Sequence, residues 1–180
     1  MQSIEISTRI VIICGPTSSG KTTMAYRIKN EFNGESIVIS HDEVLATINQ
    51  KQSQEKIDEQ FRLAYFNSIK DAYQNKANQL IIIDSVNIRA INLQAFIHLL
   101  TLFADVRLEE ISIVKLWIPE EINIINALQH YTDKNTDYVL DCTLQQRQIF
   151  SGLIGSLWRR YVENEIIVTD YEYNISFRLS

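Results

Sequence analysis

Eight residues near the amino terminus carry the strongest chemical signal in the sequence. Gly15-Pro16-Thr17-Ser18-Ser19-Gly20-Lys21-Thr22 matches the phosphate-binding pattern G-x-x-x-x-G-K-[ST] at every fixed position. In this pattern backbone N–H groups wrap a phosphate chain, the lysine reaches the terminal phosphates and the threonine hydroxyl faces Mg²⁺. We predict that these residues and Thr23 bind a nucleoside triphosphate such as ATP. We further expect Lys21 to assist catalysis and Thr22 to be a metal ligand.

The segments on either side of this loop support the same interpretation. Residues 9–14 form an apolar, β-branched run typical of a buried strand, and residues 23–29 favour a helix. A strand, a glycine-containing loop and a helix in that order would aim the positive end of the helix dipole at a bound phosphate.

A second candidate group follows the next predicted strand, residues 35–40. In an open parallel sheet, ligands bind beyond the carboxyl ends of the strands, so the carboxylate of Asp42 is placed to face the phosphate loop. We expect Asp42 to be the general base that takes the proton of an acceptor hydroxyl. The alternative is that Asp42 caps a helix over residues 44–48, and both roles are compatible. His41 is a candidate contact for the acceptor.

A third candidate group ends the predicted buried strand at residues 79–84. Asp84 stands where a second aspartate supports Mg²⁺ in enzymes with this kind of phosphate loop. The alternative is an aspartate that only ends a strand or starts a turn. Asn87, a little further on, is a candidate contact for the acceptor.

Together these three segments resemble the polynucleotide kinase family and related small P-loop kinases. The likeness runs from about Arg9 to Asn87 and rests on the phosphate loop, on Ser40-His41-Asp42-Glu43-Val44 and on Ile82-Ile83-Asp84-Ser85-Val86-Asn87. It implies a P-loop NTPase fold and a phosphotransferase that uses ATP and Mg²⁺. The acceptor would be a hydroxyl group, either a nucleic-acid 5′-hydroxyl or that of a small metabolite.

Two neighbouring families share parts of this pattern. The amino-acid sequence of the loop is also similar to that of isopentenyltransferases, which act on tRNA or adenine nucleotides and have an aspartate after the second strand. The pair of carboxylates at strand ends is also similar to chloramphenicol phosphotransferase. The acceptor therefore stays open at this point.

The expected position of a lid over the phosphates lacks positive charge. In small P-loop kinases this region carries arginines, whereas residues 123–131 contain no Arg or Lys. Lys134 and Arg147 are the nearest substitutes, and the alternative is that both are ordinary surface charges. The polar residues 132–138 are candidates for a mobile covering loop. Without lid cations, a non-catalytic nucleotide-binding protein is a further alternative.

Strand and helix patterns alternate along the chain, which predicts one domain over residues 1–180. We expect an α/β fold of three layers, with a mainly parallel five-stranded sheet and helices on both faces. The remaining expected elements are helices at 53–77, 91–103, 120–130 and 144–162, the last with interruptions at Gly152 and Gly155, and strands at 110–118, 165–169 and 171–177.

Composition restricts the class of protein. The 180 residues include 46% hydrophobic and 22% charged residues, as in globular domains, with no apolar run long enough for a membrane span and no secretory signal. A cytoplasmic protein with no membrane partner is therefore expected. The net charge of −5 opposes strong non-specific binding to nucleic acid. Cys14 and Cys142 are too few for a disulfide framework.

Overall fold

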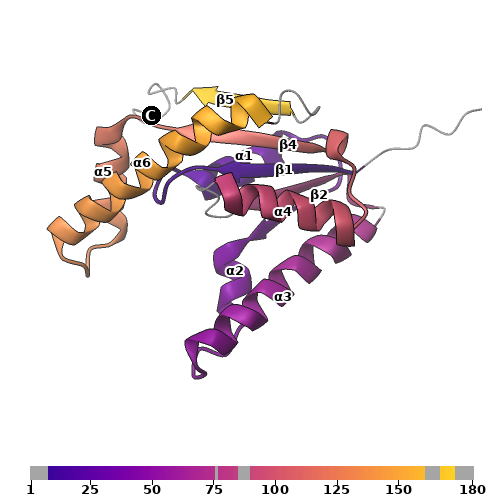
Figure 1. Ribbon diagram of the computed structural model, residues 1–180, viewed down its shortest axis with the longest axis horizontal. Helices are drawn as coiled ribbons and strands as arrows, with labels where there is room; N and C mark the ends of the chain where they lie inside the picture. The colour runs from indigo at the N-terminus through magenta and orange to yellow at the C-terminus, as the bar shows by residue number, and fades with distance from the viewer. Residues whose placement is uncertain (1–7, 76, 85–89, 161–166, 173–180) are drawn as a thin grey trace, which may run out of the picture.

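Five parallel strands form one sheet in the computed structural model, which describes residues 8–75, 77–84, 90–160 and 167–172. The strand order across the sheet is β2-β3-β1-β4-β5, and every pairing is parallel (Figure 1). The expected mainly parallel five-stranded sheet is therefore confirmed. The strands are β1 (Arg9–Cys14), β2 (Ser36–Ser40), β3 (Leu80–Asp84), β4 (Ile111–Trp117) and β5 (Ile167–Glu172).

The two strands at the centre of the sheet are apolar on both faces because both faces are covered. All five residues of β3 are buried, and Ile10, Ile12 and Ile13 of β1 have no exposed surface. Near-continuous β-branched runs of this kind are what parallel strands between helical layers require. The strand carboxyl ends then meet along one edge of the sheet.

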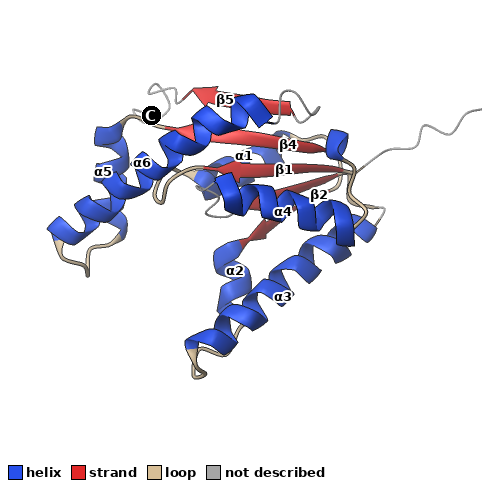
Figure 2. Ribbon diagram, in the orientation of Figure 1, coloured by secondary structure: helices blue, strands red, loops and turns tan. Residues whose placement is uncertain are grey.

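Helices cover both faces and complete the three layers (Figure 2). On one face, α3, α4 and α6 pack Ile69, Leu93 and Phe150 against the sheet, and on the other α1 and α5 contribute Met24 and Ile122. The helices are α1 (Lys21–Glu31), α2 (His41–Ala46), α3 (Gln54–Gln74), α4 (Ala90–Phe103), α5 (Glu120–His130) and α6 (Thr136–Arg160), with a short 3₁₀ helix at Leu108–Glu110.

Helix α6 differs most from its prediction. It begins at Thr136 and runs without interruption through Gly152 and Gly155. Its buried residues Val139, Thr143 and Phe150 recur on one helical face, and this packing offsets the roughly 1 kcal/mol that a glycine costs inside a helix. The expected covering loop at 132–138 is therefore shorter, because its last three residues are helical.

Two other elements also differ from their predicted residue ranges. Helix α2 begins at His41 with Ser40 in the N-cap position, so Asp42 lies in the first helical turn and the interpretation of Asp42 as the cap was wrong. The described strand β5 (Ile167–Glu172) runs through Asp170, so it joins parts of the two strands expected at 165–169 and 171–177. Residues 165 and 166 lie outside the described residues. Residues 173–177 of the expected edge strand lie outside the described residues.

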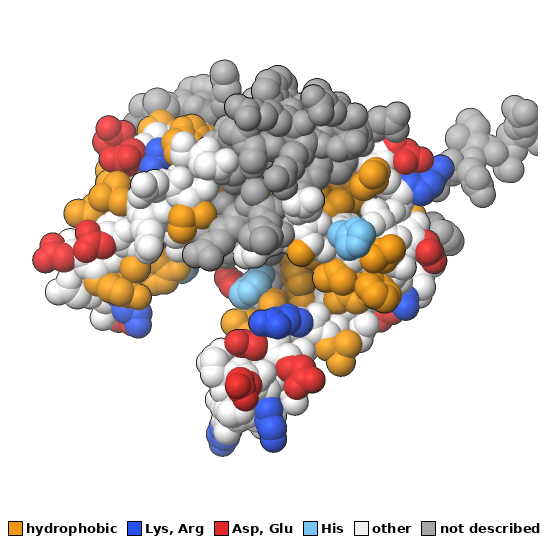
Figure 3. Space-filling model, viewed as in Figure 1, with side chains coloured by type: hydrophobic (Ala, Val, Ile, Leu, Met, Phe, Trp, Pro, Cys, Tyr) orange, Lys and Arg blue, Asp and Glu red, His pale blue; other side chains and the backbone are white. Residues whose placement is uncertain are grey.

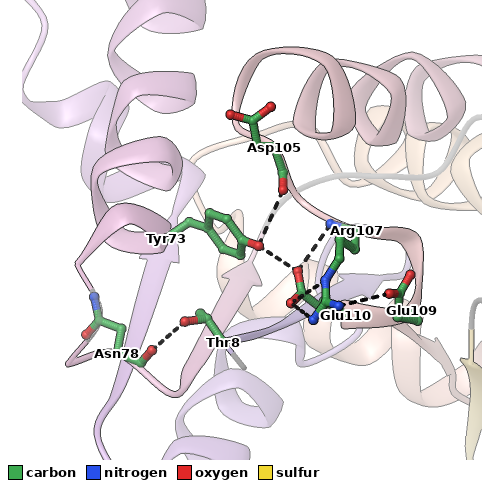
Figure 4. Close-up of polar contacts among 7 residues, drawn as sticks. All are labelled: Thr8, Tyr73, Asn78, Asp105, Arg107, Glu109 and Glu110. Atoms are coloured by element: carbon green, nitrogen blue, oxygen red, sulfur yellow. Dashed lines mark hydrogen bonds and ion pairs between the residues drawn. The ribbon is translucent and has the colours of Figure 1, made fainter. Parts of the chain in front are cut away.

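The buried carboxylate of Glu110 lies just before the first residue of β4, Ile111. Figure 4 shows its polar contacts. Glu110 accepts hydrogen bonds from the Tyr73 hydroxyl at 2.6 Å and from Arg107 Nη2 at 2.7 Å, Nε at 3.1 Å and backbone N at 3.1 Å. These bonds join α3 to the segment that leads into β4, so they fix how the helix lies on the sheet.

Two helical projections flank the other end of the sheet. The α5–α6 hairpin and the α2–α3 pair both extend beyond the carboxyl ends of the strands, and the surface is hollowed between them (Figures 1 and 3). Among the described residues, no helix combines the length and apolarity that a membrane span needs.

Candidate active site

A cavity of about 330 Å³ opens at the carboxyl edge of the sheet, inside this hollow. Its wall combines the phosphate loop, the end of β2 with the start of α2, the end of β3 and the end of α5. The lining residues are Thr17, Ser18, Gly20, Lys21, Thr22, Ser40, His41, Asp42, Asp84, His130 and Tyr131. Three of the segments singled out in the sequence therefore meet at one place, as the parallel topology requires.

The backbone of the loop is shaped for an anion. Gly20 has φ 88°, a left-handed conformation that glycine adopts at little cost, and α1 begins at the next residue. Ser18 is also left-handed, with φ 59°. A loop that ends at a helix amino terminus presents both N–H groups and the positive end of the helix dipole to a phosphate.

Lys21 is held inside this loop. Its side-chain Nζ donates a 2.7 Å hydrogen bond to the carbonyl oxygen of Pro16, and the residue is only 8% exposed. Burial lowers the pKa of Lys21 to about 8, although the negative charges of Asp84 and Asp42 act in the opposite direction. Burial also raises the pKa of the Cys14 thiol to about 12, so this thiol is neutral at physiological pH.

A hydroxyl and a carboxylate stand together next to Lys21. Thr22 Oγ1 donates a 2.6 Å hydrogen bond to Oδ2 of Asp84, which is 5% exposed. These are hard oxygen donors, and Mg²⁺ characteristically takes only one or two protein ligands of this kind beside substrate phosphates. No group of three or more His, Cys, Asp or Glu side chains suited to a metal occurs among the described residues. The donor set therefore fits Mg²⁺ bound together with a nucleotide.

Asp42 lies on the opposite wall of the cavity and is open to solvent. Its side chain is 92% exposed, and its Oδ1 lies 3.1 Å from Nδ1 of His41. The imidazole of His41 in turn packs on the ring of Phe61, with 4.4 Å between ring centroids. Asp42 is close enough to the other walls for its charge to act on both. It opposes the fall in the pKa of Lys21. The pKa of Tyr131 is raised by burial first and by the charge of Asp42 second.

The two residues proposed as lid cations do not line this cavity. Arg147 is buried, donates to the carbonyl oxygen of Ile118 at 2.8 Å, and stacks 4.3 Å from the ring centroid of Trp117. Its guanidinium thus packs between α6 and the segment that leads into α5, and not over the phosphate loop. Lys134 is exposed, pairs with Asp133 at 3.5 Å, and borders an adjoining cavity of about 250 Å³, which shares Thr17 and Tyr131 with the first. Asn87 lies outside the described residues.

Three lining residues were not among the predicted site residues. Ser40 lies beside Asp84 in the β2–β3 register, and His130 and Tyr131 stand at the end of α5. The alignment of strand ends could have indicated Ser40. His130 and Tyr131 belong to the expected lid segment, which was searched only for Arg and Lys. Their imidazole and phenol groups are polar, and these groups could have indicated a contact with the cavity.

Comparison with known proteins agrees with this geometry. A family model described as an AAA domain matches residues 10–123, which is more than half of the chain. The chain belongs to this AAA domain family. The match covers the loop, both carboxylate-bearing strand ends and β4. No curated protein matches the sequence of this AAA domain.

Two solved structures share the fold of this AAA domain. The first, "Structure of Pnkp1/Rnl/Hen1 complex", superposes with a TM-score of 0.53 at 21% identity, over 68% of this chain and 40% of the matched chain. The second, "Structure of the Pnkp1/Rnl/Hen1 RNA repair complex", gives a TM-score of 0.62 at 18% identity, over 81% of this chain and 46% of the matched chain. The AAA domain thus spans less than half the length of each matched chain.

Proposed function

We propose that this AAA domain is an ATP- and Mg²⁺-dependent phosphotransferase that moves the γ-phosphate to a hydroxyl acceptor. One observation carries the proposal: Lys21, the Thr22–Asp84 pair and Asp42 surround a single cavity. The first two suit the phosphates, and the third suits the acceptor. The fold shared with a chain of each Pnkp1/Rnl/Hen1 complex is consistent with this chemistry.

The arrangement supports direct, in-line transfer. The Asp42 carboxylate accepts the proton of the acceptor hydroxyl while that oxygen bonds to the γ-phosphorus. The bond from the γ-phosphorus to the bridging oxygen breaks, and ADP leaves with the electron pair. Lys21 stabilises the charge on the phosphate oxygens. Thr22 and Asp84 would hold Mg²⁺, whose charge, when bound, offsets that of the β- and γ-phosphates.

The acceptor that we favour is the 5′-hydroxyl end of a nucleic acid. Asp42 is 92% exposed and lines a cavity whose walls include the start of α2 and the end of α5. The surface is hollowed between these two helical projections (Figure 3), so the end of a long chain has access to Asp42. One of the two matched structures is that of an RNA repair complex, and we carry this acceptor class over as part of the proposal.

The test offers γ-labelled ATP and Mg²⁺ with a 5′-hydroxyl RNA, a 5′-hydroxyl DNA, or small hydroxylated metabolites. Labelled RNA or DNA is the expected product, and matched 5′-phosphorylated oligonucleotides are the control because their acceptor hydroxyl is blocked. A parallel reaction supplies dimethylallyl diphosphate and an adenine-containing RNA. Prenylated RNA without label transfer would replace the proposal with isopentenyl transfer.

A second candidate, a nucleotide-binding protein without transfer activity, follows from one further observation. Within the described part of the chain, Lys21 is the only Lys or Arg that lines the cavity. Transfer with a single cation would lack the covering charge of a lid arginine. This candidate predicts ATP binding without acceptor-dependent ADP release, and such release would exclude it.

A further inference from the structure

Side-chain amides from the α5–α6 hairpin contact the outer side of the phosphate loop. Asn123 Nδ2 donates to the carbonyl oxygen of Thr17 at 2.8 Å, and Asn126 Nδ2 donates to that of Ser18 at 3.2 Å. Gln146 Oε1 accepts the Thr17 N–H at 2.7 Å. These bonds link residues more than 100 positions apart, and they connect the loop to both helices of the hairpin.

The two asparagine bonds set the direction of two peptide planes. In a trans peptide the C=O of one residue and the N–H of the next point in opposite directions, and no described peptide bond is cis. When Asn123 holds the Thr17 oxygen, the Ser18 N–H therefore points away from the hairpin. Asn126 turns the Ser19 N–H in the same way. The Ser19 N–H donates to the Pro16 oxygen at 3.3 Å, the same acceptor that Lys21 Nζ uses, so a bound phosphate would replace this oxygen as the acceptor of both donors.

Asn123 is itself held in place from behind. The residue has no exposed surface, and Arg147 Nη1 lies 3.4 Å from its Oδ1 while donating to Ile118. This contact orients the amide so that Nδ2, the donor end, faces Thr17. A donor on the carbonyl side of a peptide also polarises the N–H on the other side, which strengthens that N–H as a donor to an anion.

We propose that Asn123 and Asn126 are positioning residues that pre-orient the Ser18 and Ser19 N–H groups for the phosphates of the nucleotide. This inference rests on the proposed function as far as the nucleotide is the ligand. Two neutral side-chain amides of α5 would thus orient the phosphate loop, in the same segment that lacks lid cations. Arg147 contributes to this orientation by holding the Asn123 amide.

Binding of ATP without any acceptor tests this inference separately from transfer. Titration calorimetry with ATP and Mg²⁺, repeated with inorganic tripolyphosphate, compares wild type with Asn126→Ala and Asn123→Asp. Loss of one such hydrogen bond corresponds to about three- to tenfold weaker binding of either ligand. Gln129→Ala, at an exposed position of the same helix, is the control with unchanged affinity. The amide resonances of Ser18 and Ser19 in the free protein should shift in Asn126→Ala and stay in place in Gln129→Ala.

Equal affinities for wild type and Asn126→Ala, within about twofold, would overturn the inference. If the buried Asn123→Asp variant fails to fold, the half-buried Asn126 decides alone. A wild-type protein that binds ATP but transfers no phosphate would remove the proposed function and leave this inference standing. Normal phosphate transfer by the wild-type protein, with unchanged ATP affinity in both asparagine variants, would support the proposed function and overturn this inference.

Discussion

Thr22, in the first turn of α1, and Asp84, at the end of β3, meet through a 2.6 Å hydrogen bond. The contact exists because β1, which leads into the loop and α1, is a direct neighbour of β3, with Ile13 opposite Asp84 in the register. Both residues face the cavity that also contains Lys21. In the proposed function, this hydroxyl and this carboxylate would be the protein ligands of Mg²⁺, with a nucleotide and water as the other ligands.

Removing the charge of Asp84 is therefore expected to remove the metal dependence of ATP binding. Asp84→Asn should weaken binding of ATP with Mg²⁺ by about 10- to 100-fold and leave binding of ATP in EDTA nearly unchanged. Titration calorimetry with and without Mg²⁺ measures both. Asp133→Asn changes a carboxylate that is 75% exposed and serves as the control. An equal loss in both conditions would contradict a metal role for Asp84.

The depressed pKa of Lys21 predicts how binding changes with pH. A phosphate favours the charged lysine, and Lys21 begins to lose its proton near pH 8 in the free protein. ATP affinity in EDTA should therefore stay level below about pH 8 and fall by up to about tenfold per pH unit above it. Binding at about pH 9 should take up close to one proton, which calorimetry in two buffers detects.

Lys21→Arg provides the matched comparison for this pH dependence. Arginine keeps its charge over the whole range, so its affinity should not fall between about pH 8 and 9.5. Cys14 does not contribute, because burial raises its pKa to about 12. A wild-type protein that binds at about pH 9 without proton uptake would disprove the assignment.

Glu110 is expected to matter for stability rather than activity (Figure 4). Glu110→Ala leaves the buried Tyr73 hydroxyl without its 2.6 Å acceptor, which should cost about 2 kcal/mol of unfolding free energy. Burial alone would raise the pKa of Glu110, but the hydrogen bonds from Tyr73 and Arg107 outweigh it and lower the pKa. The stabilisation from its charge is therefore complete above about pH 4.5 and is lost as the pH falls through the lower, folded-state pKa.

Urea unfolding at several pH values checks this prediction. The difference between wild type and Glu110→Ala should be constant near neutral pH and shrink below about pH 4.5. Glu109→Gln, at a largely exposed carboxylate 3.4 Å from Arg107, should leave the curve unchanged. If the difference in unfolding free energy grew as the pH fell, the lowered pKa assigned to Glu110 would be contradicted.

Arg147 and Lys134 should behave differently from lid cations. Arg147→Met removes a buried donor to the Ile118 oxygen and a stacking contact with Trp117, so we expect a loss of about 2 kcal/mol in stability. Lys134→Ala should change neither stability nor transfer rate. Thermal unfolding and a label-transfer assay separate the two effects. A large fall in the transfer rate of Lys134→Ala at unchanged stability would restore its lid role.

The features that could be predicted from the sequence are those set by local patterns. The loop at Gly15–Thr22 and its flanking strand and helix depend on residues that are near one another in the chain. Asp42 and Asp84 were found because parallel strands end at one edge. Their roles as base and metal ligand stay predictions.

The hairpin could not be predicted in the same way. Its contacts with Thr17 involve Asn123 and Gln146, which lie 106 and 129 positions away in the chain. Arg147 resembled an available surface cation because burial depends on partners such as Trp117 that the helical pattern does not identify. Gly152 indicated a break in the helix, yet it faces solvent while Phe150 packs in the core.

Two adjacent carboxylates allow the most direct test of the proposed transfer. Asp42 lines the cavity, whereas Glu43 accepts a hydrogen bond from Tyr26 at 3.1 Å and does not line it. The measurement is the single-turnover rate of label transfer from γ-labelled ATP to a 5′-hydroxyl RNA by Asp42→Asn and Glu43→Gln. We predict a rate lower by about a hundredfold or more for Asp42→Asn, with unchanged ATP affinity, and a near wild-type rate for Glu43→Gln. Equal rates for Asp42→Asn and wild type would contradict the proposed role of Asp42 as the general base.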